Sequence, residues 1–236
     1  MTPLEGCVYL GIPNVCRTVM DGKPTPDQFD QEMIPLEKVP NVVWSIVGSC
    51  DSEYYKNGGN DIKKIVELSE KYPNITGGIM DDILNEMRID IYTPEIIQGY
   101  AKELHTLGPR PLDLWTVIYE HELEPWAVPY LEACDIFSFW TWHGKHLVDL
   151  EENIYKVRKL FPNKPVYVGM YMWDYGARKE LPDELMQHQL DVVYRLIKNK
   201  TIEGVIFCSN TIADNGIKAV YMVKDWIAEH GDEVIE

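Results

Sequence analysis

The stretch Ile75-Thr-Gly-Gly-Ile-Met-Asp-Asp82 is a short apolar run that ends in two adjacent carboxylates. Such a run is typical of a buried strand, and Asp belongs at the end of a strand rather than inside it. Because Gly77 and Gly78 have no side chains, strand alternation does not decide whether Asp81 or Asp82 points inward. The two glycines leave room for a bulky neighbour or a ligand.

Six further runs have the length and the apolar or aromatic character of buried strands. They are Cys7–Ile12, Asn41–Gly48, Leu112–Tyr119, Ile136–Trp142, Val166–Trp173 and Ile202–Ser209. Segments of helical periodicity lie between them, such as Pro182–Lys198 and Ile217–His230. Another is predicted to begin at Thr93, a good N-cap residue, with Pro94 at the first helical position.

Continuous apolar strands that alternate with helices indicate a parallel sheet covered by helices, hence an α/β fold. Seven such units without an interrupting linker favour a TIM-type (β/α) barrel, and we expect one domain over residues 1–236. One unit of the usual eight is not visible, so the barrel is expected to be incomplete or to lack its first unit. A dinucleotide fold is disfavoured because no Gly-rich phosphate loop follows the first predicted strand.

The composition limits the partners. The formal net charge of −16 argues against nucleic acid and against an anionic membrane surface, so we expect a small-molecule or oligosaccharide ligand that is neutral or cationic. With no signal peptide or apolar spanning segment in the chain as given, a cytoplasmic location is the default expectation. The five cysteines are interpreted as small buried side chains, neither a disulfide framework nor a zinc site. No cofactor is predicted, and the oligomeric state stays open.

In a (β/α) barrel the active site forms where the strands end, so the predicted strand ends can be searched for chemistry. They are rich in carboxylates and aromatic residues. Sugars stack on aromatic rings, and cleavage of a glycosidic bond needs two carboxyl groups. We therefore predict Asp82 or Asp81, together with Glu120, as the catalytic pair, with Glu122 in the following loop. The predicted substrate-binding residues are Trp140, Trp142, His143, Tyr171, Trp173, Asp174 and Asn210.

Four stretches carry a resemblance to known proteins: Leu10-Gly-Ile-Pro-Asn-Val15, Val43-Trp-Ser-Ile-Val-Gly48, Gly78-Ile-Met-Asp-Asp82 and Ile202-Glu-Gly-Val-Ile-Phe207. With these, the chain resembles glycoside-hydrolase-like (β/α) barrels, in particular a group of uncharacterised bacterial proteins. The resemblance implies a barrel fold and a carbohydrate-active class. It transfers no catalytic pair, because Glu120 follows Tyr119 here, whereas the large retaining clan has an Asn-Glu pair after its fourth strand.

The leading hypothesis is thus a glycoside hydrolase. A first alternative is a divalent-metal sugar isomerase or epimerase that uses Asp82, Glu120, His121 and His143, since carboxylate and imidazole ligands suit Mn or Mg. A second alternative is a sugar-binding barrel without catalysis.

Overall fold

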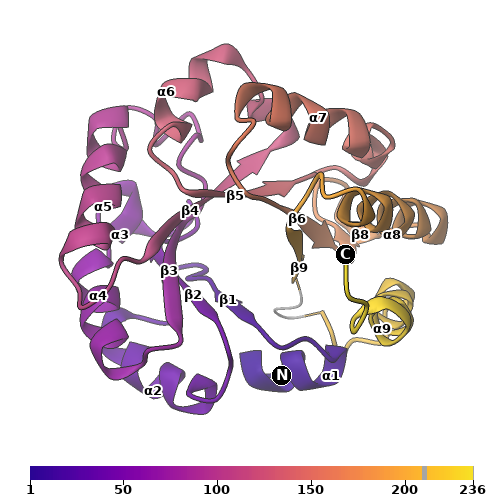
Figure 1. Ribbon diagram of the computed structural model, residues 1–236, viewed down its shortest axis with the longest axis horizontal. Coiled ribbons are helices and arrows are strands. Elements are labelled where there is room, and N and C mark those ends of the chain that lie inside the picture. The colour runs from indigo at the N-terminus through magenta and orange to yellow at the C-terminus, as the bar shows by residue number, and fades with distance from the viewer. Residues whose placement is uncertain (209–211, 236) are drawn as a thin grey trace. The chain divides into compact units, whose positions relative to one another are not determined.

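A computed structural model describes residues 1–208 and 212–235. The chain divides into two compact units. Unit 1 comprises Met1–Pro13, Tyr119–Leu123 and Ser138–Glu236, and unit 2 comprises Asn14–Ile118 and Glu124–Phe137. Figure 1 labels most of the helices and strands of both units.

Unit 2 contains the first strands and their helices (Figure 1). Its elements are β1 (Val15–Arg17), η1 (Pro26–Gln28), α2 (Phe29–Met33), η2 (Ile34–Leu36), β2 (Val42–Val47), α3 (Glu53–Lys56), α4 (Ile62–Lys71), β3 (Ile75–Met80), α5 (Pro94–Thr106), η4 (Pro125–Ala127) and α6 (Val128–Leu131), with most of β4 (Asp113–Tyr119) and the start of β5 (Ile136–Trp140). The pairs β1·β2, β2·β3 and β3·β4 are parallel. Helix α4 packs on β2 and β3, and every residue of β2 is buried.

Unit 1 contains the later strands and helices. Its elements are α1 (Pro3–Leu10), η3 (Glu120–Glu122), η5 (Gly144–Asp149), α7 (Leu150–Leu160), β6 (Val166–Tyr171), β7 (Trp173–Asp174), β8 (Lys179–Glu180), α8 (Asp183–Lys198), β9 (Gly204–Cys208) and α9 (Lys218–His230), with the end of β5. Strands β6 and β9 are parallel, whereas β7 and β8 form a short antiparallel hairpin. Helix α8 packs against α7 and α9, and α1 packs against α9.

The predicted fold class is confirmed. Within the described residues the main sheet has seven strands, in the order β1-β2-β3-β4-β5 through unit 2 and β5-β6-β9 through unit 1. Strands joined by helices in this order make a TIM-type α/β fold. In the residues that the structure describes, no helix is long and apolar enough to cross a membrane.

The first predicted strand is wrong: Cys7–Ile12 lies largely in helix α1. The Thr2 hydroxyl accepts the Glu5 N–H at 3.3 Å, and the Glu5 carboxylate accepts the Thr2 N–H at 2.7 Å. Pro3 occupies the first turn, so the sequence Thr-Pro-Leu-Glu is a capping box that overrides the apolar run behind it. The first strand is instead Val15–Arg17.

Two other predicted strands end early. The run Ile136–Trp142 is a strand only to Trp140, and Val166–Trp173 is a strand only to Tyr171, after which Trp173 begins the hairpin. By contrast, β3 has the predicted bounds, and the Thr93 side chain caps α5 with Pro94 in its first turn. The glycines of β3 serve close packing, because a Cβ on Gly77 would lie 2.8 Å from Nε1 of Trp115.

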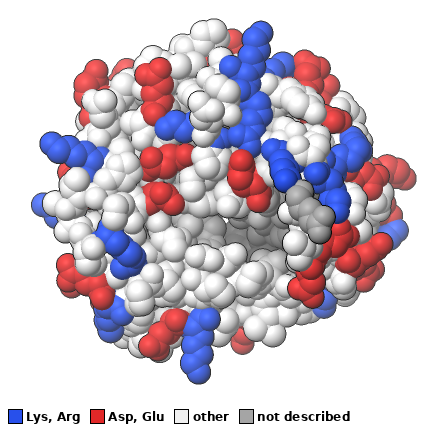
Figure 2. All heavy atoms as spheres, viewed as in Figure 1, with Lys and Arg blue, Asp and Glu red and all other residues white. Residues whose placement is uncertain are grey.

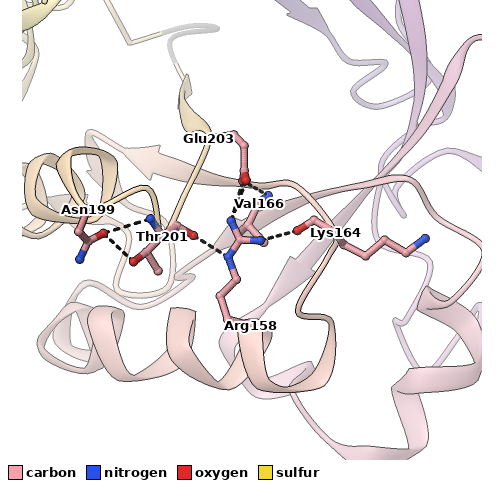
Figure 3. A network of polar contacts seen from close by, with 6 residues as sticks. All are labelled: Arg158, Lys164, Val166, Asn199, Thr201 and Glu203. Carbon is pink, nitrogen blue, oxygen red and sulfur yellow. Dashed lines mark hydrogen bonds and ion pairs between the residues drawn. The ribbon is translucent and has the colours of Figure 1, made fainter. Parts of the chain in front are cut away.

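Beside the starts of β6 and β9, unit 1 is held by a polar network around Arg158 of α7 (Figure 3). The Arg158 guanidinium donates to both carboxylate oxygens of Glu203, at 2.9 and 2.8 Å. It also donates to the carbonyl oxygens of Thr201 and Lys164, each at 2.6 Å. The same Glu203 carboxylate accepts the N–H of Val166 at 2.6 Å, so one ion pair joins α7 to both strand starts.

Candidate functional site

Glu120 is the first residue of η3 and follows β4 directly. Its side chain is largely buried, with 9% exposed. One carboxylate oxygen lies 3.0 Å from Nδ1 of His146, and the other accepts the backbone N–H of Trp142 at 3.0 Å. Nδ1 of His121 lies 3.9 Å from the second oxygen. The short turn of η3 therefore holds a carboxylate against two imidazoles and a peptide N–H.

This environment keeps Glu120 ionised. Burial alone would raise the pKa of Glu120, but the nearby His121 imidazole and the hydrogen bonds from His146 and the Trp142 N–H outweigh it and lower the pKa to about 2. The Glu120 carboxylate in turn raises the pKa of His121. Glu120 is thus suited to accept hydrogen bonds at neutral pH, and not to donate a proton.

Glu122 is not a solvated loop residue. It is buried in η3, where its carboxylate accepts the N–H of Tyr119 at 2.8 Å and so closes the turn after β4. This contact explains why Glu120 and Glu122, two residues apart, have different environments. Glu122 shapes the turn that presents Glu120.

Five aromatic rings of unit 1, Tyr119, Trp140, Trp142, Tyr171 and Tyr175, form what we call the aromatic cluster. The Trp142 ring lies 5.9 Å from Tyr119, 6.0 Å from Tyr171 and 5.8 Å from Tyr175, centroid to centroid. Tyr171 also lies 4.7 Å from Trp140. Trp142 is 38% exposed whereas Trp140 is buried, so Trp142 is the ring of this pair that can stack on a ligand.

The structure thus brings together three predicted residues, Trp140, Trp142 and Tyr171, on the unit that carries Glu120. The cluster also contains Tyr119 and Tyr175, which are not among the predicted substrate-binding residues. Both could have been suspected, because each is adjacent in the sequence to a predicted site residue, Glu120 or Asp174.

The remaining predicted binding residues of unit 1 lie around the β7–β8 hairpin. Trp173 is half-buried in β7, and the buried Asp174 carboxylate accepts the N–H of Ala177 at 2.9 Å. The His143 ring packs against Gly176, where a Cβ would lie 2.1 Å from Nδ1 of His143. The hairpin therefore supports the loop that follows β5. Asn210, also predicted, lies outside the described residues.

Asp81 and Asp82 belong to unit 2, directly after β3. Asp81 is buried, and its N–H donates to the carbonyl oxygen of Val47 at 2.9 Å. Asp82 has a φ of +52°, in the left-handed region, and its carboxylate accepts the N–H of Cys50 at 3.0 Å. The two carboxylates thus follow a strand end that is fixed to the neighbouring loop after β2.

Sequence reasoning missed Arg88, which is completely buried in unit 2. Its guanidinium donates to the carbonyl oxygens of Gly48, Ser49 and Asp81. A buried cation at the ends of β2 and β3 shares this region with Asp81 and Asp82. No local sequence pattern predicts that Arg88 is buried, because it lies in an irregular segment without helical or strand periodicity.

Within residues 1–208 and 212–235, no group of three or more His, Cys, Asp or Glu side chains is arranged to hold a metal ion. The ligands proposed for a metal isomerase, Asp82, Glu120, His121 and His143, accordingly do not form such a group in this part of the chain.

No family model and no curated protein matches this sequence. Solved structures do match its fold. Tamarind chitinase-like lectin has a TM-score of 0.56 and 11% identity over 92% of this chain and 91% of the lectin. The GH99 endo-alpha-mannosidase from Bacteroides thetaiotaomicron has a TM-score of 0.55 and 9% identity over 96% and 77% of the two chains.

The glycoside hydrolase domain of PgaB from Bordetella bronchiseptica has a TM-score of 0.51 and 9% identity over 93% and 90% of the two chains. These neighbours are glycoside-hydrolase-like barrels, as the sequence resemblance implies. At such low identities the similarity concerns the fold.

Proposed function

We propose that this protein binds a sugar at the aromatic cluster and hydrolyses a glycosidic bond with the help of Glu120. The observation that carries the proposal is the ionised, largely buried carboxylate of Glu120 held by the backbone of Trp142, the exposed ring of the cluster. An aromatic face next to a fixed carboxylate suits a sugar, which offers C–H faces for stacking and hydroxyl groups for hydrogen bonding.

Glycoside hydrolysis also needs a proton donor. Glu120 does not suit that role, because its pKa is lowered to about 2. We assign the acid to Asp81 or Asp82, as the sequence predicts, and the two aspartates are equivalent in this proposal. Hydrolysis by this route requires one of them to act as the general acid toward the glycosidic oxygen.

The ligand is proposed to be a neutral or cationic sugar. The formal net charge of −16 disfavours polyanions. On the face shown in Figure 2, acidic side chains lie beside the basic ones. The fold shared with a mannosidase and with the glycoside hydrolase domain of PgaB is consistent with this class, as an analogy of fold.

The test is a survey of 4-nitrophenyl glycosides and oligosaccharides of neutral and amino sugars with the wild-type chain. On the substrate that is cleaved, we expect Glu120→Gln and one of Asp81→Asn and Asp82→Asn to lower kcat by at least about 100-fold. We expect Trp142→Ala to raise KM. Full activity of all three carboxyl variants would refute the proposal, and Tyr155→Ala, an exposed residue of α7, is the control.

A second candidate is a sugar-binding protein without turnover. Two observations favour it: protein donors occupy both oxygens of Glu120, and one structural neighbour is a chitinase-like lectin. The test is isothermal titration calorimetry with an oligosaccharide that the chain does not cleave. Binding to the wild type that is lost in Trp142→Ala would support this candidate over the hydrolase.

A further inference from the structure

Glu120 and His146 form a carboxylate–imidazole pair. Oε1 of Glu120 lies 3.0 Å from Nδ1 of His146. Since Glu120 is ionised and can only accept, the hydrogen of this bond belongs to Nδ1. In the neutral imidazole the lone pair is then on Nε2, at the far side of the ring from the carboxylate. In the described part of the chain, no group is hydrogen-bonded to Nε2, and the side chain is 40% exposed.

The short element η5, which carries His146, is held in place. The N–H of His146 donates to the carbonyl oxygen of His143 at 2.9 Å, and the N–H of Gly176 donates to the carbonyl oxygen of Trp142 at 3.0 Å. A Cβ on Gly144 would lie 2.8 Å from Oδ2 of Asp174, so η5 packs closely on the β7–β8 hairpin. Such support is what a side chain needs to keep one orientation during a reaction.

We infer that Glu120 is a positioning residue, and that it holds His146 so that Nε2 is the proton acceptor of the site. This inference rests on the proposed function and changes the role of Glu120 within it, from the base itself to the group that orients the base. The Glu120 carboxylate is a weak base, because its pKa is about 2 and each oxygen already accepts a hydrogen bond, whereas the lone pair on Nε2 of His146 accepts no hydrogen bond within the described residues.

The step is a direct displacement by water. Nε2 of His146 takes one proton from the water molecule, whose oxygen forms a bond to the anomeric carbon. The bond from that carbon to the glycosidic oxygen breaks, and the glycosidic oxygen takes a proton from the second carboxyl group of the proposed function. The imidazolium, stabilised by the Glu120 carboxylate, afterwards returns its proton to solvent. The sugar configuration is inverted.

His121 is a weaker choice for this role. Its Nδ1 lies 3.9 Å from Glu120, its side chain is 64% exposed, and its ring stacks on Tyr119 with centroids 5.6 Å apart. A matched control for His146 exists in unit 2. His105 is 39% exposed and pairs with Asp135 at 2.8 Å, but through Nε2 rather than Nδ1. The two pairs therefore differ in the nitrogen that stays free.

The tautomer of His146 tests the positioning. In the chain of residues 1–236 labelled with 15N, long-range 1H–15N spectra are expected to show the hydrogen of neutral His146 on Nδ1. In Glu120→Ala, the hydrogen is expected on Nε2. His105 should not change, which also reports that the variant is folded. A wild-type His146 with its hydrogen on Nε2, or a tautomer that Glu120→Ala leaves unchanged, would overturn the inference.

The accessibility of the lone pair is tested with diethyl pyrocarbonate, which acylates unprotonated imidazole nitrogen. Peptide mass spectrometry should find His146 modified in the wild type, and modified more slowly in Glu120→Ala. A His146 that stays unmodified while the more exposed His121 reacts would contradict a free Nε2. Neither measurement needs a substrate, so a chain that cleaves no glycoside would refute the proposed hydrolase while these two results still decide the pairing.

With a cleaved glycoside, His146→Gln and Glu120→Ala should each lower kcat by about 100-fold or more, with a small change in KM. The double variant should be no slower than the slower single variant, because the two residues act as a unit. Added imidazole should restore part of the activity of His146→Gly. The expected product is the inverted anomer. A retained anomer, or an unchanged kcat in His146→Gln, would show that His146 is not the base.

Discussion

Nη2 of Arg88 donates a hydrogen bond to the carbonyl oxygen of Ser49 at 2.7 Å. Nη1 of the same guanidinium donates to the carbonyl oxygens of Gly48, at 2.8 Å, and Asp81, at 3.0 Å. Arg88 thereby joins the residues that follow β2 to the residue that follows β3. The backbone that carries the two candidate aspartates is therefore held by a buried cation, in addition to the sheet.

Replacing Arg88 should destabilise the protein strongly. Arg88→Met leaves three carbonyl oxygens without their donor, and we expect a loss of about 3 kcal/mol or more in the free energy of unfolding. Urea titration followed by circular dichroism measures it. Arg178→Met, at an exposed residue of the β7–β8 turn, is the control and should change stability by less than about 0.5 kcal/mol. A similar small effect for Arg88→Met would mean that water or other donors replace the guanidinium.

The low pKa of Glu120 predicts a pH dependence of stability. The pKa is lowered from 4.5 to about 2 in the folded state, so the stabilisation is fully present above about pH 4.5 and is lost as the pH falls toward 2. We expect the stability difference between wild type and Glu120→Gln to shrink through this window. Paired urea titrations between pH 2 and 5.5 measure it, and His121 stays protonated over that range. A difference that is constant with pH would argue that the native state does not stabilise the charge.

Gly169 of β6 should not tolerate a side chain. A Cβ there would lie 1.9 Å from Cδ2 of Trp140 and so would overlap the indole ring. We expect Gly169→Ala to displace Trp140, to cost about 1 to 3 kcal/mol of stability and to change the tryptophan fluorescence. The control is Gly99→Ala in α5, where a Cβ meets nothing within 4 Å and where alanine should stabilise the helix by roughly 0.5 to 1 kcal/mol. If both variants behaved alike, Trp140 would not need the space above Gly169.

The ion pair between Arg158 and Glu203 should contribute more than an exposed pair on the same helix (Figure 3). Arg158 is largely buried, binds both oxygens of Glu203 and also satisfies two carbonyl oxygens. We expect Arg158→Ala to cost about 2 to 3 kcal/mol. Removing the exposed pair Lys156–Glu152 with Lys156→Ala should cost at most about 0.5 kcal/mol. A double-mutant cycle with Glu203→Ala isolates the pair, and a coupling energy near zero would contradict this prediction.

Much of the secondary structure could be predicted because its causes are local. Apolar runs of strand length identified β2, β3 and β4, and Thr93 with Pro94 marked the start of α5. Where two local signals compete, the apolar run gave a wrong prediction. The run around Cys7 predicted a strand, but the capping box of Thr2 and Glu5 starts a helix there. The prediction of one domain over residues 1–236 stays a prediction.

For the candidate site, the sequence predicts which chemical groups follow the strands: Asp81 and Asp82 after β3, Glu120 after β4 and His143 after β5, with Trp142 as the last residue of that predicted strand. The partners of these groups depend on the tertiary structure. His146 is 26 residues from Glu120, and Arg88 is 39 residues from Ser49. Periodicity describes the surroundings of a residue within one strand or helix. A hydrogen bond across such separations depends on how loops from different elements pack, and that packing decides which nitrogen of His146 carries the hydrogen.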